Sequence, residues 1–125
     1  MLNIQTKYIV IGVLVLALLA FVYFTGKKSG NKQKPKPLKL PNNGSGIPED
    51  WSPVNDVVRL YEAMDGMGTD EEAIYWVLTG KTDDQLAAIY NEYGNRYGED
   101  LIEALRDELS GEELSRALDY FKNII

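Results

Sequence analysis

The stretch AMDGMGTDEEAI, residues 63–74, places two glycines and a threonine directly before a run of acidic side chains. Glycine tolerates a left-handed backbone, so a turn built on Gly66 and Gly68 can aim successive carbonyl oxygens at one point. A calcium ion takes roughly six to eight oxygen ligands from carbonyls, waters and carboxylates. The residue types of this loop therefore suit a hard divalent cation.

The acidic residues of the stretch also have an explanation that needs no ligand. Asp70, Glu71 and Glu72 open a predicted helix, where the helix dipole favours negative charge. In the same motif, TDEE, the side chains of Thr69 and Glu72 form a predicted capping box on free backbone N–H groups. These carboxylates belong to the helix, so a cation in the loop would need a carboxylate from elsewhere in the chain.

Composition excludes several classes of function. The 125 residues include no Cys and no His, which removes thiol and imidazole nucleophiles and the usual zinc ligands. All 19 acidic residues lie at or after Glu49, where six basic residues leave a net charge of −13, so nucleic acid is not an expected partner. The carboxylate pairs fall at predicted helix starts, and neither a nucleophile elbow nor a P-loop lysine is present. We therefore do not expect an enzyme.

The N-terminal part has the pattern of a membrane anchor. Residues 8–24, YIVIGVLVLALLAFVYF, carry no charge and would span roughly 25 Å as a helix. The run is long and no small-residue cleavage site follows it, so we expect a retained single-pass transmembrane anchor over residues 1–26 rather than a cleaved signal peptide. Six lysines follow the run and one precedes it. This bias favours the cytoplasmic or interior side for the rest of the chain.

The remaining sequence divides into a predicted linker and a predicted helical domain. Residues 27–50 are rich in Lys, Pro, Gly and Asn, which is typical of a flexible linker. Residues 51–125 show five amphipathic segments, which begin after the capping signals Ser52, Thr69, Thr82, Asp100 and Ser110. The predicted fold class is all-α, with an anchor, a linker and a compact five-helix domain.

Residues 64–114 resemble a single annexin repeat, through GMGTDEEAI at the loop, YGEDL before the fourth helix and DELSG after it, without gaps. The resemblance implies five short helices wound into a right-handed superhelix. It also implies a main Ca²⁺ site formed by the carbonyls of Met64, Gly66 and Gly68 with the carboxylate of Glu108. A weaker secondary site would use the Thr69 carbonyl and Glu71.

This chain departs from the annexin pattern in three ways. Annexins usually carry four repeats, whereas this chain has one. Gly80 and Lys81 stand where the family often has Ser-Arg after the second helix. Annexins are peripheral proteins, whereas an anchor is predicted here. The resemblance therefore bears more directly on the fold than on the activity.

Two hypotheses of function follow. In the first, the chain is a membrane-anchored protein whose repeat binds anionic phospholipid headgroups through Ca²⁺ or tethers membranes. In the second, it is a structural adaptor without calcium dependence, such as a minor membrane protein of a lipid-containing virion or a component of a bacterial envelope. A lone repeat also lacks neighbouring repeats, so self-association or a protein partner is expected if aromatic side chains are exposed. The candidates are Trp51, Tyr75, Trp76 and Phe121.

Overall fold

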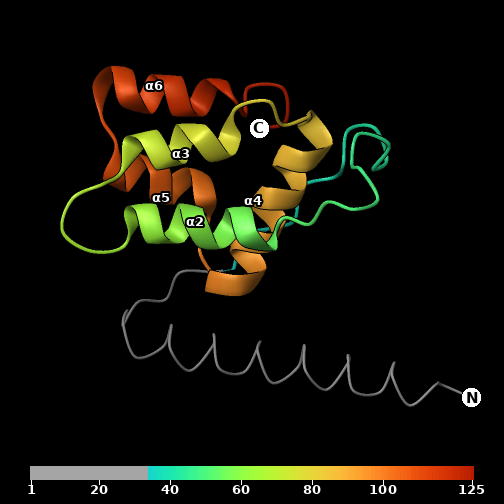
Figure 1. Cartoon of the computed structure of the whole chain (residues 1–125), viewed down its shortest axis with the longest axis horizontal. Helices are drawn as coiled ribbons and strands as arrows, with labels where there is room; N and C mark the ends of the chain where they lie inside the picture. Colours follow the sequence, from blue (N-terminus) through green and yellow to red (C-terminus); the bar gives the residue numbers. More distant parts are fainter. Residues whose placement is uncertain (1–33) are drawn as a thin grey trace, which may run out of the picture.

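The computed structural model describes residues 34–125. Within this range the chain forms five α-helices and no strand: α2 (Val54–Met64), α3 (Glu71–Leu78), α4 (Asp83–Tyr97), α5 (Leu101–Glu108) and α6 (Gly111–Asp119). Four of the helices lie side by side, and α4 runs across them (Figure 1). The all-α prediction is confirmed for the described residues.

The predicted transmembrane anchor, residues 1–26, lies outside the described residues. Among residues 34–125, no helix combines the length and the apolar character needed to cross a bilayer. The anchor stays a prediction.

One hydrophobic core receives side chains from every helix. Each fully buried aliphatic or aromatic side chain contributes about 1.5–3 kcal/mol to folding. The shared core holds the ends of the helices, and hence their connecting loops, in fixed positions. The largest side chains with less than 2% exposure include Leu60, Ile74, Leu78, Ile89, Tyr93, Leu101, Leu105 and Phe121.

The structure corrects the list of exposed aromatic candidates. Trp76 is 66% exposed, as the hypothesis required, but Tyr75 and Phe121 are buried. Trp51 is half-buried and packs against the core. Tyr75 lies next to Ile74 on the inward face of α3, and its hydroxyl donates to the Glu113 carbonyl at 3.2 Å. The prediction is therefore wrong for Tyr75 and Phe121, because a single repeat already covers them with its own helices.

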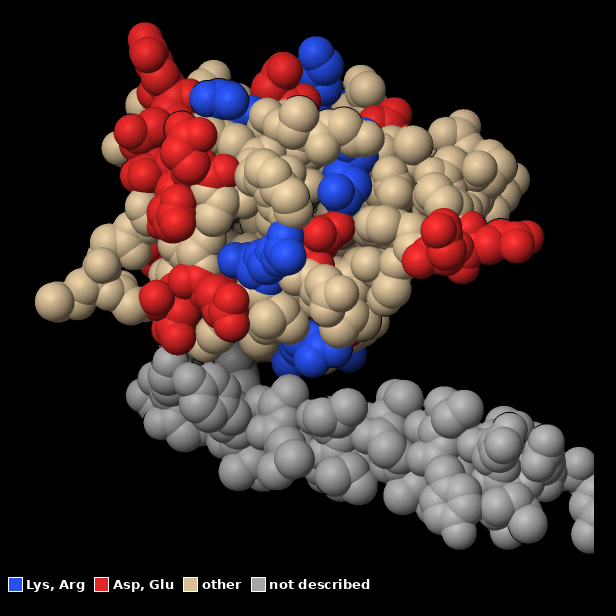
Figure 2. All heavy atoms as spheres, in the orientation of Figure 1, with Lys and Arg blue, Asp and Glu red and all other residues tan. Residues whose placement is uncertain are grey.

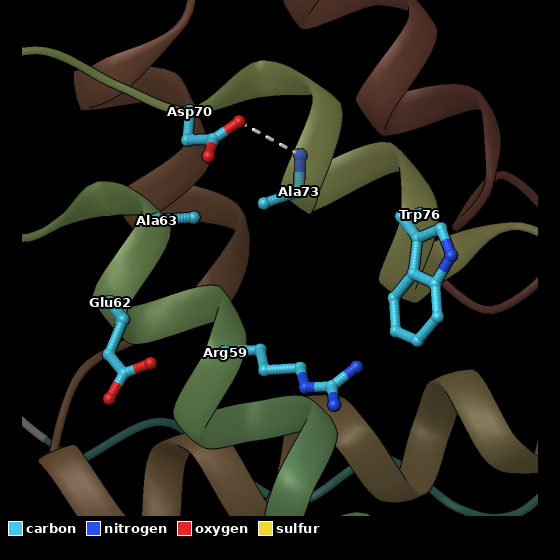
Figure 3. A pocket seen from close by; sticks show the side chains of 6 residues that line it. All are labelled: Arg59, Glu62, Ala63, Asp70, Ala73 and Trp76. Carbon is cyan, nitrogen blue, oxygen red and sulfur yellow. Dashed lines mark hydrogen bonds between the residues drawn. The ribbon is translucent and has the colours of Figure 1, made fainter.

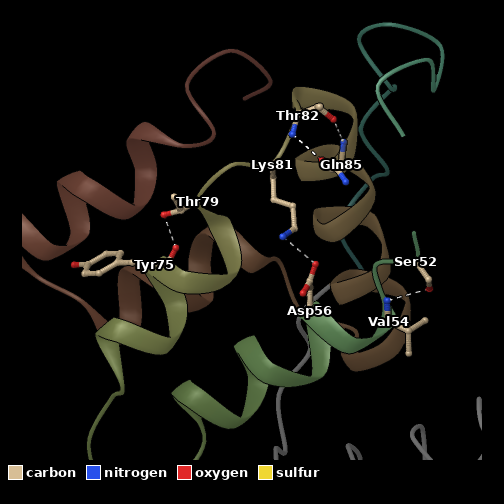
Figure 4. Close-up of polar contacts among 8 residues, drawn as sticks. All are labelled: Ser52, Val54, Asp56, Tyr75, Thr79, Lys81, Thr82 and Gln85. Carbon is tan, nitrogen blue, oxygen red and sulfur yellow. Dashed lines mark hydrogen bonds and ion pairs between the residues drawn. The ribbon is translucent and has the colours of Figure 1, made fainter. Parts of the chain in front are cut away.

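The first turns of α4 and α5 begin as the sequence predicts. Figure 4 shows the Thr82 hydroxyl accepting the Gln85 N–H at 3.1 Å, while Gln85 Oε1 accepts the Thr82 N–H at 2.9 Å. The Asp100 carboxylate accepts the N–H groups of Ile102 and Glu103. These bonds satisfy donors that have no partner inside the helix.

The other predicted helix starts differ in detail. At α2, Pro53 is the N-cap, and the Ser52 hydroxyl accepts the Val54 N–H at 3.3 Å (Figure 4). At α6, Ser110 is the N-cap but its side chain makes no capping bond. The capping box predicted for Thr69 and Glu72 is wrong, because Asp70 is the N-cap of α3 and its carboxylate accepts the Ala73 N–H.

Residues 38–46, here called the strap, contact α4 through backbone hydrogen bonds. The Asn91 amide holds both main-chain groups of Leu38, accepting its N–H at 2.7 Å and donating to its carbonyl at 2.9 Å. The Asp84 carboxylate, which has no exposed surface, accepts the N–H groups of Asn42 at 2.8 Å and Gly46 at 2.9 Å. The Leu38 side chain also packs against the core.

The strap changes the interpretation of the predicted linker. We expected residues 27–50 to form a flexible linker, but their described part includes a segment that packs on α4. The Pro35 ring also lies close to α4, since a Cβ added at Gly94 would be 2.8 Å from it. Composition misses such a segment because main-chain groups, rather than apolar side chains, make most of its contacts.

The strap yields a stability prediction. Replacing Asp84 with Ala leaves two backbone N–H groups without their buried acceptor, so the free energy of unfolding should fall by about 2–3 kcal/mol in urea denaturation. Asp83→Ala is the matched control, since it removes a carboxylate from the same helical turn at a cost below about 1 kcal/mol. Equal losses in the two variants would mean that the strap contributes no stability.

Candidate functional site

The loop between α2 and α3 is a tight hinge built on two glycines. The Asp70 N–H donates to the Ala63 carbonyl at 2.9 Å and closes the loop at its base. Gly66 has a φ of +113° and Gly68 a φ of +89°, values that other residues adopt only under strain. Between them, the side chain of Met67 is completely exposed. The loop therefore turns sharply and presents an apolar side chain at its tip.

The carboxylate of Glu108 lies against this loop. The Thr69 hydroxyl donates to Glu108 Oε2 at 2.8 Å, although the two residues are 39 positions apart. Glu108 is the last residue of α5, and the buried side chains of Leu105 and Leu109 on either side hold that end of the helix in place. Packing of the core thus brings a distant carboxylate to the glycine loop.

The other predicted ligands lie around the same loop. Glu71 is the first residue of α3, and together with Gly68 and Thr69 it lines a hollow on the outside of the loop. Met64 ends α2, with its side chain buried and its backbone at the start of the loop. The structure therefore gathers the predicted residues in one region. Their roles as metal ligands stay a prediction.

The donor chemistry of the loop fits a hard cation. In the described residues, no group of three or more acidic side chains is arranged to hold a metal by itself, so a cation would need main-chain carbonyls as well. A Cβ added at Gly66 or Gly68 would meet no atom within 4 Å. The loop thus leaves open space on its surface for an ion and its waters.

The surface around the loop is strongly acidic. On the face drawn in Figure 2, carboxylates gather over the end of the domain that carries the loop, whereas Lys and Arg lie nearer the middle. Glu62 and Asp65 also line the hollow outside the loop, although neither was a predicted site residue. Their positions near the end of the first predicted helix and directly before Gly66 could have marked them as residues of the site.

The tyrosines beneath the site stiffen the contact between α2 and α4. Tyr61 stacks on Tyr97 with ring centroids 4.0 Å apart, and Tyr93 meets Tyr97 edge-on. Burial raises the pKa of Tyr97 to about 12, and the charge of nearby Arg96 opposes this rise only in part. Burial and the hydrogen bond to Asp100 raise the pKa of Tyr90 well above its usual value. Both rings are therefore neutral packing groups at ordinary pH.

These features define a class of helical repeat, in which a glycine-hinged loop after the first helix meets a carboxylate at the end of the fourth. Residues 55–116 match the family model for annexin. The chain therefore contains a single annexin repeat.

Individual annexins show the same similarity. The chain is 46% identical over 63 residues to annexin A13 of Mus musculus, a match covering 50% of this chain and 20% of the relative. It is 44% identical over 72 residues to annexin A8 of Oryctolagus cuniculus, which covers 56% of this chain and 22% of the relative. The same region is 43% identical to annexin A8 of Homo sapiens. The chain thus spans about a fifth of the length of these relatives.

The contact between Thr69 and Glu108 can be measured by a double-mutant cycle. Thr69→Val and Glu108→Ala should show a coupling energy of about 0.5–1 kcal/mol in urea unfolding of the full chain. The control cycle pairs Thr69→Val with Glu112→Ala, which changes an exposed acid on the next helix, and should show no coupling. Zero coupling in the first cycle would contradict the contact.

Proposed function

We propose that the repeat binds anionic phospholipid headgroups through Ca²⁺ held at the loop between α2 and α3. The observation that carries the proposal is the 2.8 Å hydrogen bond from the Thr69 hydroxyl to Glu108, which brings a carboxylate to the loop of Gly66 and Gly68. The match of residues 55–116 to the annexin model supports it.

In this proposal the chain supplies oxygen ligands of two kinds. The carbonyls of Met64, Gly66 and Gly68 act with the Glu108 carboxylate at the main site. A weaker site uses the Thr69 carbonyl and the side chain of Glu71. The Thr69 hydroxyl orients Glu108, and the positive φ of the two glycines sets the direction of the loop carbonyls. When bound, Ca²⁺ would link these oxygens to a lipid phosphate.

Electrostatics make this contact dependent on the cation. The part of the chain from Glu49 onward has a net charge of −13, and its carboxylates crowd the loop end of the domain. An anionic bilayer repels such a surface within the Debye length of about 8 Å at physiological salt. A divalent ion between the loop and the headgroups reverses the sign of the interaction.

Met67 supplies an apolar contact in the same proposal. Its side chain is completely exposed at the tip of the loop, between the two hinge glycines. When the loop meets a bilayer, this side chain can enter the boundary between headgroups and acyl chains. Calcium then brings the loop to the surface, and Met67 adds affinity there.

The predicted anchor would keep the repeat close to a membrane. If residues 1–26 cross a bilayer, the repeat stays beside a lipid surface at high effective concentration. Because residues 38–46 pack on α4, residues 27–37 would connect the anchor to the strap, and they can span at most about 40 Å. Contact with the same bilayer is then favoured over a long-range tether.

Calcium dependence is tested with the full chain immobilised through an N-terminal tag. Vesicles of phosphatidylserine and phosphatidylcholine should be captured with Ca²⁺ and released by EDTA. Glu108→Gln should weaken calcium affinity by about tenfold or more, because it removes the only charged ligand of the main site. Glu49→Gln, the same change of charge at the other end of the domain, should behave as the parent chain.

Capture that is unaffected by EDTA and by Glu108→Gln would refute the calcium mechanism. A chain that binds neither Ca²⁺ nor vesicles would instead favour the adaptor hypothesis.

The role of Met67 has a separate test. Met67→Ser should leave calcium affinity without lipid unchanged but weaken vesicle capture at saturating Ca²⁺ by about tenfold, since an apolar side chain no longer enters the bilayer. Val54→Ser is the control, because Val54 is also an exposed apolar side chain but lies on α2 away from the loop. Equal effects in both variants would exclude insertion of the loop tip.

A further inference from the structure

A groove of about 330 Å³ lies between α2 and α3, next to the candidate site, and Glu62, Ala63 and Asp70 line both the groove and the hollow outside the loop. Its lining residues are Arg59, Glu62, Ala63, Asp70, Ala73 and Trp76. Figure 3 shows the Arg59 side chain extending along the groove toward the indole of Trp76. The indole is 66% exposed, which is a large apolar surface to leave in water on a domain of this size.

Two opposite charges in this groove lack ion-pair partners among residues 34–125. The Arg59 guanidinium lies over the Trp76 ring, 4.7 Å from its centroid, a contact that uses none of its N–H donors. Glu62 lies three residues further along α2, yet Figure 3 shows the two side chains pointing away from each other. At the same spacing, Arg106 pairs with Glu103 and Lys122 with Asp119.

We propose that this groove is a self-association surface whose occupant is a second copy of this chain. In a two-fold arrangement each copy presents the same patch, so the patch must be complementary to itself. Two α2 helices packed antiparallel would place Arg59 of each copy opposite Glu62 of the other. The two indoles would be covered in the same interface, where Trp and Arg commonly contribute most of the binding energy.

The mixed charge of the groove favours a second copy over other occupants. A purely anionic partner would leave Glu62 unpaired, and a purely basic one would leave Arg59 unpaired. Asp70, the remaining carboxylate of the groove, already caps α3 through the Ala73 N–H. Trp76 is six residues beyond that cap, which places it about 9 Å along the helix from the loop that the proposed function brings to lipid.

The distribution of charge over the domain is compatible with such packing. On the face drawn in Figure 2, the carboxylates gather toward the two ends, and Lys and Arg side chains lie over α2 in the middle. Antiparallel contact along α2 would set the basic middle of one copy near the carboxylates at the loop end of the other. The inference does not rest on calcium or lipid binding, so it can fail or hold independently of the proposed function.

Charge reversal provides the test. The full chain in non-ionic detergent is studied by sedimentation velocity, without Ca²⁺ and without vesicles. Arg59→Glu and Glu62→Arg should each weaken dimerisation by about tenfold or more, because each sets like charges opposite one another. The double variant should recover dimerisation, and a mixture of the two single variants should form heterodimers. Arg106→Glu, an equal change of charge outside the groove, should dimerise as the parent chain.

A second measurement reports directly on the groove. In a Trp51→Phe background, Trp76 is the remaining tryptophan, and its emission should shift to shorter wavelength as the chain dimerises. A chain that stays monomeric overturns the proposal, as does association that both single charge reversals leave unchanged. A Trp76 shift that occurs only with vesicles also overturns it and assigns the groove to lipid instead.

Discussion

The candidate site depends on the contact between the end of α5 and the loop that follows α2. Glu108 is exposed and could adopt many positions, but the buried leucines on either side of it fix the last turn of its helix. The Thr69 hydroxyl then holds the carboxylate at the loop. Without the shared core, nothing in the local sequence around Gly66 would bring an acid from 40 residues away.

Two adjacent residues at the end of the loop, Thr69 and Asp70, make different contacts. Asp70 caps α3, because its carboxylate accepts the Ala73 N–H. Thr69 is thereby released from capping, and its hydroxyl points toward α5. Asp70 therefore begins α3, while its neighbour Thr69 makes the polar contact to α5.

The domain is larger than the repeat that the family model covers. The match begins at residue 55, yet the strap packs on α4 from Leu38 onward. Asp84 and Asn91, both on α4, hold it almost entirely by its main chain. These bonds make the N-terminal approach to the repeat part of the folded unit, and they set where the preceding residues leave it.

Local patterns in the sequence were enough to predict the five helices and the capping roles of Thr82 and Asp100. They succeed because helix periodicity and capping depend on residues within about four positions of one another. The resemblance to annexins also placed Glu108 in the same site as Gly66 and Gly68. Local patterns could not decide whether Thr69 or Asp70 begins α3, since both are good N-cap residues.

Only the tertiary structure decided which aromatic residues are buried, where residues 38–46 lie and which arginines within residues 34–125 lie over an aromatic ring rather than beside a carboxylate. Tyr75 and Trp76 are neighbours in the chain, yet one is covered by α6 and the other faces water. Such outcomes depend on contacts between segments far apart in sequence. Residue type and spacing determined the helices of this protein, whereas the packing of those helices determined which of their side chains can meet a ligand or a partner.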